Sequence, residues 1–231
     1  MRMFPIFAGA LTLVAPLPAL AQDVQQDVQL WEQLNVVLPV AKGVRVTAEQ
    51  IARTSDRQEG VYTTEYGVLV GVQIARGIEL GLGYRRVGFF NANTAADEDR
   101  IRQQIVIARG RFAGRLRLDE RFNPGGDEIG FRLRPLVRYN LPLGRSRVSL
   151  FGSHESFILP NSTVWGQRAG YERMRNIAGF NVPIGKALSA DIGYLNQYRI
   201  ARGGARAQMD HALSLQLTVN LDKLGVAMLH D

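Results

Sequence analysis

The sequence predicts an all-β protein, an antiparallel transmembrane β-barrel of 10–12 strands after a cleaved signal peptide. The chain begins with a short basic and apolar segment, and strand-like alternation fills almost all of the rest. Arginine takes nearly every second position in two central segments. Because a strand sends successive side chains to opposite faces, this period of two predicts strands with one charged and one apolar face.

Residues 1–21 have the pattern of a secretory signal peptide. A basic start at Met1–Met3 precedes an apolar run from Phe4 to Leu20, which ends in the small-residue pattern Ala19-Leu20-Ala21. We expect cleavage after Ala21, leaving residues 22–231 as one exported domain. Nothing later approaches the ~20 continuous apolar residues of a spanning helix, so a membrane crossing would be made by strands.

Composition excludes several kinds of site. The chain has no cysteine, so disulfides, thiolate metal ligands and cysteine nucleophiles are absent. A pI near 10.1 would elsewhere suggest nucleic acid, but an exported chain rarely meets any. Of the 28 basic residues only 3 are lysine. Arginine is preferred over lysine where the planar guanidinium group pairs with or binds a carboxylate or phosphate. We therefore expect arginines used for pairing or anion contact, with no nucleic acid, metal or cofactor.

Eleven strand-like segments follow one another, separated by turn residues. They cover about residues 28–38, 44–53, 62–74, 78–86, 100–108, 115–122, 129–139, a segment from 147, a long segment ending near 182, 188–198 and 213–221. In the third segment Tyr62, Tyr66 and Val68 share the apolar face, opposite Thr63 and Glu65. Because single-chain bacterial barrels have even strand numbers, we expect ten or twelve strands, with residues 226–229 one candidate for the twelfth.

The sixth and seventh segments carry the arginine alternation. The first reads Arg-Leu-Arg-Leu-Asp-Glu-Arg-Phe over 115–122, and the second reads Ile-Gly-Phe-Arg-Leu-Arg-Pro-Leu-Val-Arg-Tyr over 129–139. In a soluble β-sandwich the charged face would meet water; in a membrane barrel it would line the lumen, with the apolar face toward lipid. Long strands, aromatic residues toward strand ends, and short turns alternating with longer polar loops favour the outer-membrane barrel.

The chain resembles the bacterial outer-membrane β-barrel family labelled domain of unknown function 2490. The matching features are Trp31 before a hairpin that turns at Pro39, the Arg-x-Arg-x-Asp-x-Arg strand at 115–121, the Arg-x-Arg pair at 132–134, the Glu-x-Phe element at 155–157 and Gly-Tyr-Leu-Asn-Gln at 193–197. The resemblance spans the mature chain and implies a fold and a location, but no activity. One departure is the final Leu229-His230-Asp231, where outer-membrane barrels usually end in an aromatic residue.

An outer-membrane phospholipase-like enzyme is one alternative. Such barrels use a serine and histidine with an orienting amide or acid on the lipid-facing wall. His154 and Glu155 are strand neighbours and point to opposite faces, so they cannot form a dyad, whereas His154 and Ser156 share a face. No zinc-protease, nucleophile-elbow or phosphate-loop motif is present, so we favour a non-enzymatic protein. The other alternative is a soluble periplasmic β-sandwich that binds a ligand.

The candidate functional residues are the charged side chains predicted to face the lumen. They are Arg115, Arg117, Asp119, Arg121, Arg132, Arg134, Arg138, Glu155 and Asp191. Two interpretations stay open: arginines and carboxylates pair and fill a narrow barrel, or the basic excess forms a narrow anion-selective pore. The expected partners are outer-membrane lipid, the barrel assembly machinery during biogenesis and, for the pore, a small anionic solute.

Overall fold

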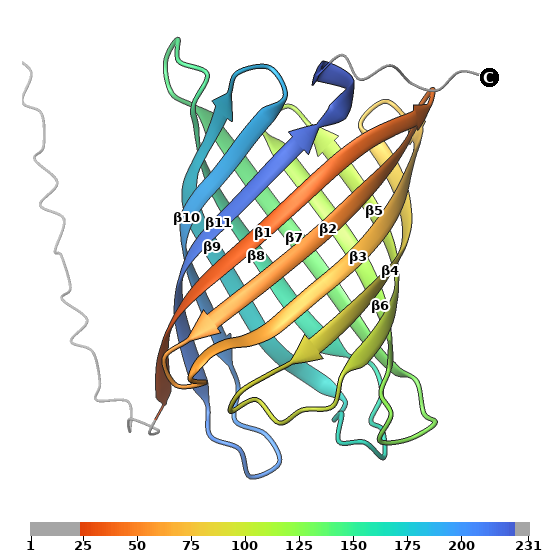
Figure 1. Ribbon diagram of the computed structural model, residues 1–231, viewed down its shortest axis with the longest axis vertical. Helices are drawn as coiled ribbons and strands as arrows, with labels where there is room; N and C mark the ends of the chain where they lie inside the picture. The colour runs from red at the N-terminus through yellow and green to blue at the C-terminus, as the bar shows by residue number, and fades with distance from the viewer. Residues whose placement is uncertain (1–23, 225–231) are drawn as a thin grey trace, which may run out of the picture.

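Alternating polar and apolar residues form eleven strands in residues 24–224, the part of the chain that the computed structural model describes (Figure 1). The strands are β1 (Gln25–Ala41), β2 (Val44–Ser55), β3 (Gly60–Ala75), β4 (Ile78–Phe89), β5 (Glu98–Arg109), β6 (Phe112–Phe122), β7 (Gly130–Pro142), β8 (Ser149–Leu159), β9 (Gly170–Ile184), β10 (Leu188–Arg199) and β11 (Gln208–Asn220). A short 3-10 helix, η1 (Leu221–Leu224), follows β11. Within residues 24–224 no helix is long and apolar enough to cross a membrane.

The strands form one closed barrel. Each pairs antiparallel with its neighbour in sequence, and β1 closes the barrel by pairing parallel to β11, from Gln25 opposite Gln208 to Val37 opposite Asn220. The predicted all-β barrel is confirmed, and the two-sheet sandwich is wrong. The expected strand number of ten or twelve is also wrong, because the described residues form eleven strands. In an up-and-down barrel with an odd number of strands, the first and last strands run in the same direction, and here a parallel ladder joins them. The predicted signal peptide and the candidate strand 226–229 lie outside the described residues.

The two ends of the barrel differ. The turns after β1, β3, β5, β7 and β9 gather at the upper end in Figure 1, and most of them are short, as at Arg76-Gly77, where Gly77 takes a φ of +75° that most side chains disfavour. The longer loops 90–97, 123–129, 160–169 and 200–207 gather at the other end, with the start of β1. We call these the short-turn end and the long-loop end.

The outer wall is apolar along most strands. On β3 the exposed side chains include Val68, Val70 and Val72, and on β4 they include Leu80 and Leu82, which is 59% exposed. The alternate residues on these strands face inward, where Gly67 and Gly71 of β3 leave room beside Arg102 and Glu79. The amphipathic alternation therefore builds a barrel with its apolar face outside and most of its charge inside.

Two local predictions fail. Tyr62, assigned to the apolar outer face, instead lines the interior and donates its hydroxyl to Gln29 Oε1 at 2.9 Å. The cause is an irregularity between β2 and β3 at Arg53/Thr54, which shifts the register and re-aims the neighbouring side chains. Residues 164–169, expected in the long ninth strand, lie in a loop, because the chain turns at Gly166, whose N–H donates to the Thr163 carbonyl.

A small apolar cluster lies inside the barrel. Trp31 of β1, Leu195 of β10 and Ala212 of β11 are buried together, with Ile177 of β9 packed against them. The strands that carry these residues are neighbours around the closing pair, on another part of the wall from the arginine strands β6 and β7. The interior therefore has a small apolar cluster near the closure, among buried polar side chains such as Gln29, Gln197 and Asp210, and is strongly basic along β5–β7.

Candidate functional site

The interior contains a cavity of about 520 Å³ bordered by charged side chains. Eight of the nine candidate residues border it: Arg115, Arg117, Arg121, Arg132, Arg134, Arg138, Glu155 and Asp191. The ninth, Asp119, is 0% exposed and is bound by two arginines. The strand alternation brings these residues to one side of the sheet, and barrel closure then brings that side together around one space.

Most carboxylates in this cavity are shared between two or three arginines. Glu49 pairs with Arg85 and Arg102, Glu65 with Arg53 and Arg85, Glu98 with Arg100 and Arg121, Asp119 with Arg132 and Arg134, and Glu155 with Arg115, Arg134 and Arg175. Because a buried charge is costly unless it is paired, this sharing stabilises both signs. It also leaves more guanidinium than carboxylate in the interior.

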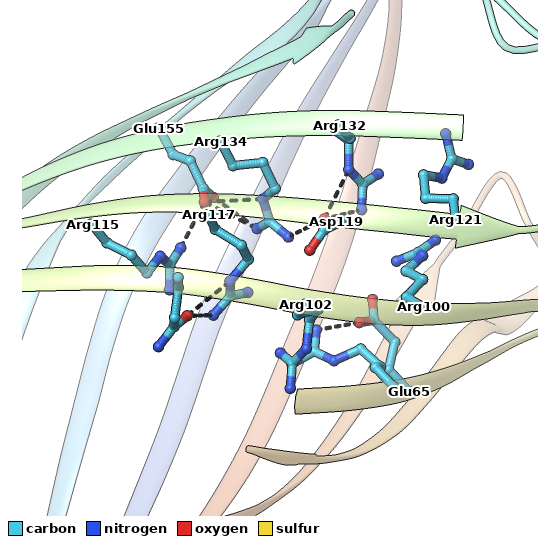
Figure 2. Close-up of polar contacts among 12 residues, drawn as sticks. Glu65, Arg100, Arg102, Arg115, Arg117, Asp119, Arg121, Arg132, Arg134 and Glu155 are labelled. Carbon is cyan, nitrogen blue, oxygen red and sulfur yellow. Dashed lines mark hydrogen bonds and ion pairs between the residues drawn. The ribbon is translucent and has the colours of Figure 1, made fainter. Parts of the chain in front are cut away.

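Arg134 lies at the centre of one such group (Figure 2). Its Nη2 lies 3.0 Å from Glu155 Oε1, and its Nη1 lies 3.3 Å from Asp119 Oδ2. Arg132, two residues earlier on β7, donates to the same Asp119 oxygen from Nε and Nη2 at 3.1 and 2.8 Å. The alternation on β7 therefore places two guanidiniums around a carboxylate of the neighbouring strand β6.

Arg117 differs from these arginines. It is buried on β6, and its Nε and Nη2 both donate to Gln104 Oε1, at 3.0 and 2.7 Å, so its polar contact is a neutral amide. The charges of Arg115, Arg134 and Arg102 add to the positive potential around it, and the Asp119 carboxylate opposes them. Arg102 Nε and Nη1 and Arg115 Nε are buried without a hydrogen-bond partner within the described residues. Of the three arginines Arg102, Arg115 and Arg117, the last two border the cavity.

Aromatic rings hold other arginines in place. The guanidinium carbons of Arg53 and Arg175 lie 4.3 and 4.5 Å from the centre of the Trp31 ring. Phe157 of β8 lies beside Arg134 and Arg175, at 4.6 and 4.9 Å. Such cation–π contacts orient guanidiniums that carboxylates alone would hold less tightly.

The loop 160–169 folds over the interior at the long-loop end. Gln167 is buried; its Oε1 accepts from Arg121 Nη1 at 2.8 Å, and its Nε2 donates to the carbonyl groups of Phe131 and Asn161. Trp165 from the same loop packs over the Arg121 guanidinium, with its ring centre 5.0 Å from the guanidinium carbon. This loop therefore contacts Arg121, a residue that borders the cavity.

Sequence reasoning missed several charged residues of the interior, among them four that border the cavity. Glu98 and Arg100 lie at the start of β5, and Arg173 and Arg175 lie on β9. All four border the cavity. Glu98 lies just before the predicted segment 100–108. The Arg-Met-Arg spacing at 173–175 carries the same period-two signal as β6 and β7, so this pair could have been found.

The remaining predicted residues pair near the short-turn end. Arg138 Nη1 lies 2.5 Å from Asp191 Oδ2, and Asn181 Nδ2 donates to the other oxygen of the same carboxylate at 2.6 Å. Among residues 24–224, no cluster of three or more histidine, aspartate or glutamate side chains has the arrangement of a metal site. The chemistry of this interior is that of guanidinium groups held by shared carboxylates.

Comparison with known proteins identifies the family. The family model described as protein of unknown function (DUF2490) matches residues 28–208. An uncharacterised protein of Methylorubrum extorquens is 34% identical over 227 residues, which cover 93% of this chain and 96% of that protein. No solved structure matches. The chain therefore belongs to the DUF2490 family of proteins of unknown function.

Proposed function

We propose that the protein is an outer-membrane β-barrel whose arginine-rich lumen forms a narrow, anion-preferring conduit. The interior role is non-enzymatic. The outer wall would contact membrane lipid, the barrel assembly machinery would insert the chain after export, and small carboxylates or phosphates would enter the lumen.

Aromatic residues at the two ends of the wall support a membrane location. Phe112 and Phe122 begin and end β6 on its outer face, ten residues apart. Ten residues span about 33 Å along a strand, and a tilt of about 35–45° reduces this to a height of about 23–27 Å. An outer-membrane barrel has an apolar band about 25 Å tall between two aromatic girdles, so this spacing fits.

The observation that carries the anion preference is the unequal pairing of interior charge. Because most interior carboxylates are already shared, an added cation would meet guanidiniums and few free acceptors. An added anion would meet Arg117, whose present partner is the neutral amide of Gln104. A carboxylate or phosphate accepts such hydrogen bonds more strongly than an amide does.

The shared ion pairs also support the structural interpretation. A network such as that around Glu155 holds strands β6 to β9 together and occupies much of a narrow lumen. The two interpretations are compatible if the paired arginines hold the barrel together and Arg117, which hydrogen-bonds only to the Gln104 amide among the described residues, contacts the solute. The cavity of about 520 Å³ suits a small anion better than a polymer.

Conductance in planar bilayers tests this proposal. With the purified full-length protein, we expect small channels whose zero-current potential in a KCl gradient shows chloride preference. Arg117→Gln should lower that preference several-fold, because it removes a guanidinium whose hydrogen bonds go to a neutral amide instead of a carboxylate. Arg86→Gln is the matched control: Arg86 pairs with Asp97 and Asp99 outside the barrel, so selectivity should be unchanged.

Four results would contradict the proposal. A folded, inserted barrel without conductance would leave the charged network as a structural core only. Channels that prefer potassium, or a preference equal in the wild type and Arg117→Gln, would remove the anion role. Release of the protein from membranes by carbonate without detergent would contradict the membrane location itself.

A further inference from the structure

Three polar side chains contact one another on the outer wall, away from the basic interior. His154 and Ser156 lie two residues apart on β8, and Asn176 of β9 lies directly opposite His154. His154 Nε2 is 3.0 Å from Ser156 Oγ, and His154 Nδ1 is 2.8 Å from Asn176 Oδ1. The imidazole therefore contacts a hydroxyl with one nitrogen and an amide oxygen with the other.

The chemistry of the partners indicates which atom donates the proton in each hydrogen bond. An amide oxygen only accepts, so His154 Nδ1 carries the proton that is donated to Asn176. Nε2 is then unprotonated in the neutral ring and accepts the hydroxyl proton of Ser156. This order of nucleophile, base and orienting group is the arrangement that activates serine in hydrolases on unrelated folds. We propose that the outer wall carries a serine esterase site for the carboxylic esters of membrane lipids, with Ser156, His154 and Asn176 as its catalytic group.

A second outward-facing histidine on the same wall has no serine or threonine beside its ring. His211 of β11 also uses both ring nitrogens, toward the Tyr194 hydroxyl at 2.5 Å and Gln26 Oε1 at 3.0 Å. Neither contact brings a serine or threonine hydroxyl to the ring. His211 is therefore a matched comparison: an outward histidine with two polar partners and no alcohol nucleophile.

The surroundings of Ser156 indicate the substrate class. The Tyr171 hydroxyl is 3.1 Å from Ser156 Oγ, and Tyr171 lies at the start of β9, near the long-loop end. Tyrosines on barrel walls sit at the membrane–water interface, where the ester bonds of glycerophospholipids also lie. Val137 flanks His154 and Met174 flanks Ser156 on the neighbouring strands, so acyl chains would contact apolar side chains. This placement rests on the proposed membrane location.

The reaction balances with water as the only co-reactant. Ser156 Oγ bonds to the ester carbonyl carbon while its proton passes to His154 Nε2, and the carbonyl oxygen takes the negative charge beside the Tyr171 hydroxyl. The carbonyl re-forms, the ester C–O bond breaks, and the protonated His154 gives its proton to the leaving alcohol. Water then attacks the acyl-serine with His154 as base, releasing a fatty acid and restoring Ser156.

Fatty-acid release by the purified full-length protein tests this inference. The substrates are vesicles of phosphatidylethanolamine and phosphatidylglycerol, with a p-nitrophenyl acyl ester in detergent micelles as a second substrate independent of bilayer insertion. We expect Ser156→Ala to abolish release and His154→Ala to reduce it about 100- to 10,000-fold. Asn176→Asp keeps an acceptor for Nδ1 and should retain more activity than Asn176→Leu.

Two measurements separate catalysis from folding. His211→Gln should hydrolyse both substrates like the wild type, and each variant should show the same heat-dependent shift of a folded barrel on electrophoresis. A fluorophosphonate should label Ser156 in the wild type and not in His154→Ala. A folded wild-type protein that releases no fatty acid and is not labelled would overturn the inference, as would full activity in Ser156→Ala. The conductance of the lumen is independent of these results.

Discussion

His154 and Glu155 are adjacent on β8, yet their side chains lie on opposite sides of the barrel wall. His154 contacts Ser156 and Asn176 on the outer surface, while Glu155 is buried inside and bound by three arginines. One strand therefore contributes to two chemically separate places. Because the two residues share no face, substitutions at one should leave the other place unchanged.

Glu155→Gln should destabilise the barrel strongly. The change removes the charge that Arg115, Arg134 and Arg175 share, and breaking a buried ion pair costs about 3–5 kcal/mol because the remaining charges are uncompensated. Urea unfolding in detergent micelles measures the loss. Glu120→Gln is the control, since Glu120 lies on the outer face and accepts from Gln103; it should change stability by less than about 0.5 kcal/mol. Equal losses in the two variants would contradict the role of the shared pairs.

A disulfide should form between Leu34→Cys and Leu217→Cys. The parallel ladder places these two residues opposite each other on β1 and β11, and the chain has no native cysteine to compete. Non-reducing electrophoresis of the oxidised double variant should show a cross-linked monomer. Leu34→Cys with Leu213→Cys is the out-of-register control, because Leu213 lies four residues before Leu217 on β11. Four residues of strand span about 13 Å, which is beyond the reach of a disulfide. Cross-linking of the control pair, or of neither pair, would contradict closure by eleven strands.

Gln167→Ala should release the loop 160–169 from the end of the barrel. The buried side chain contacts Arg121, Asn161 and the Phe131 carbonyl, and alanine makes none of these hydrogen bonds. Limited trypsin digestion should then cut faster after the exposed Arg168. Cutting after Arg57, in the separate loop between β2 and β3, is the internal reference and should keep its rate. An unchanged ratio of the two cuts would show that Gln167 does not hold the loop.

Leu82→Lys should impair insertion if the apolar wall faces lipid. Leu82 is exposed on the outer face of β4, and lysine on the lipid face of a barrel costs about 2–4 kcal/mol near the bilayer midplane. Folding into lipid vesicles, followed by the electrophoretic shift, measures the effect. Val164→Lys, in the loop 160–169 and 73% exposed before the change, should fold like the wild type. Normal folding of Leu82→Lys with higher solubility would point to a wall that faces water.

Local alternation predicted which side chains share a face. The Arg-x-Arg spacing of β6 and β7 assigned Arg117 and Arg134 to the charged side, and both border the cavity. Tyr62 shows the limit of this reasoning, because a register irregularity beside it turned the side chain inward. The loop at 164–169 shows another, since the hydrogen bonds that fold it come from residues outside the segment.

The sequence by itself determined the fold class, the two faces of most strands and the basic character of one face. These follow from the period of two in an extended chain, which depends only on neighbouring residues. The tertiary structure decided the strand number, the parallel closure, the sharing of each carboxylate and the contact of Asn176 with His154. Each depends on which residues lie opposite one another on paired strands. That register joins His154 to Asn176 on consecutive strands and Asn35 to Thr218 across 183 residues.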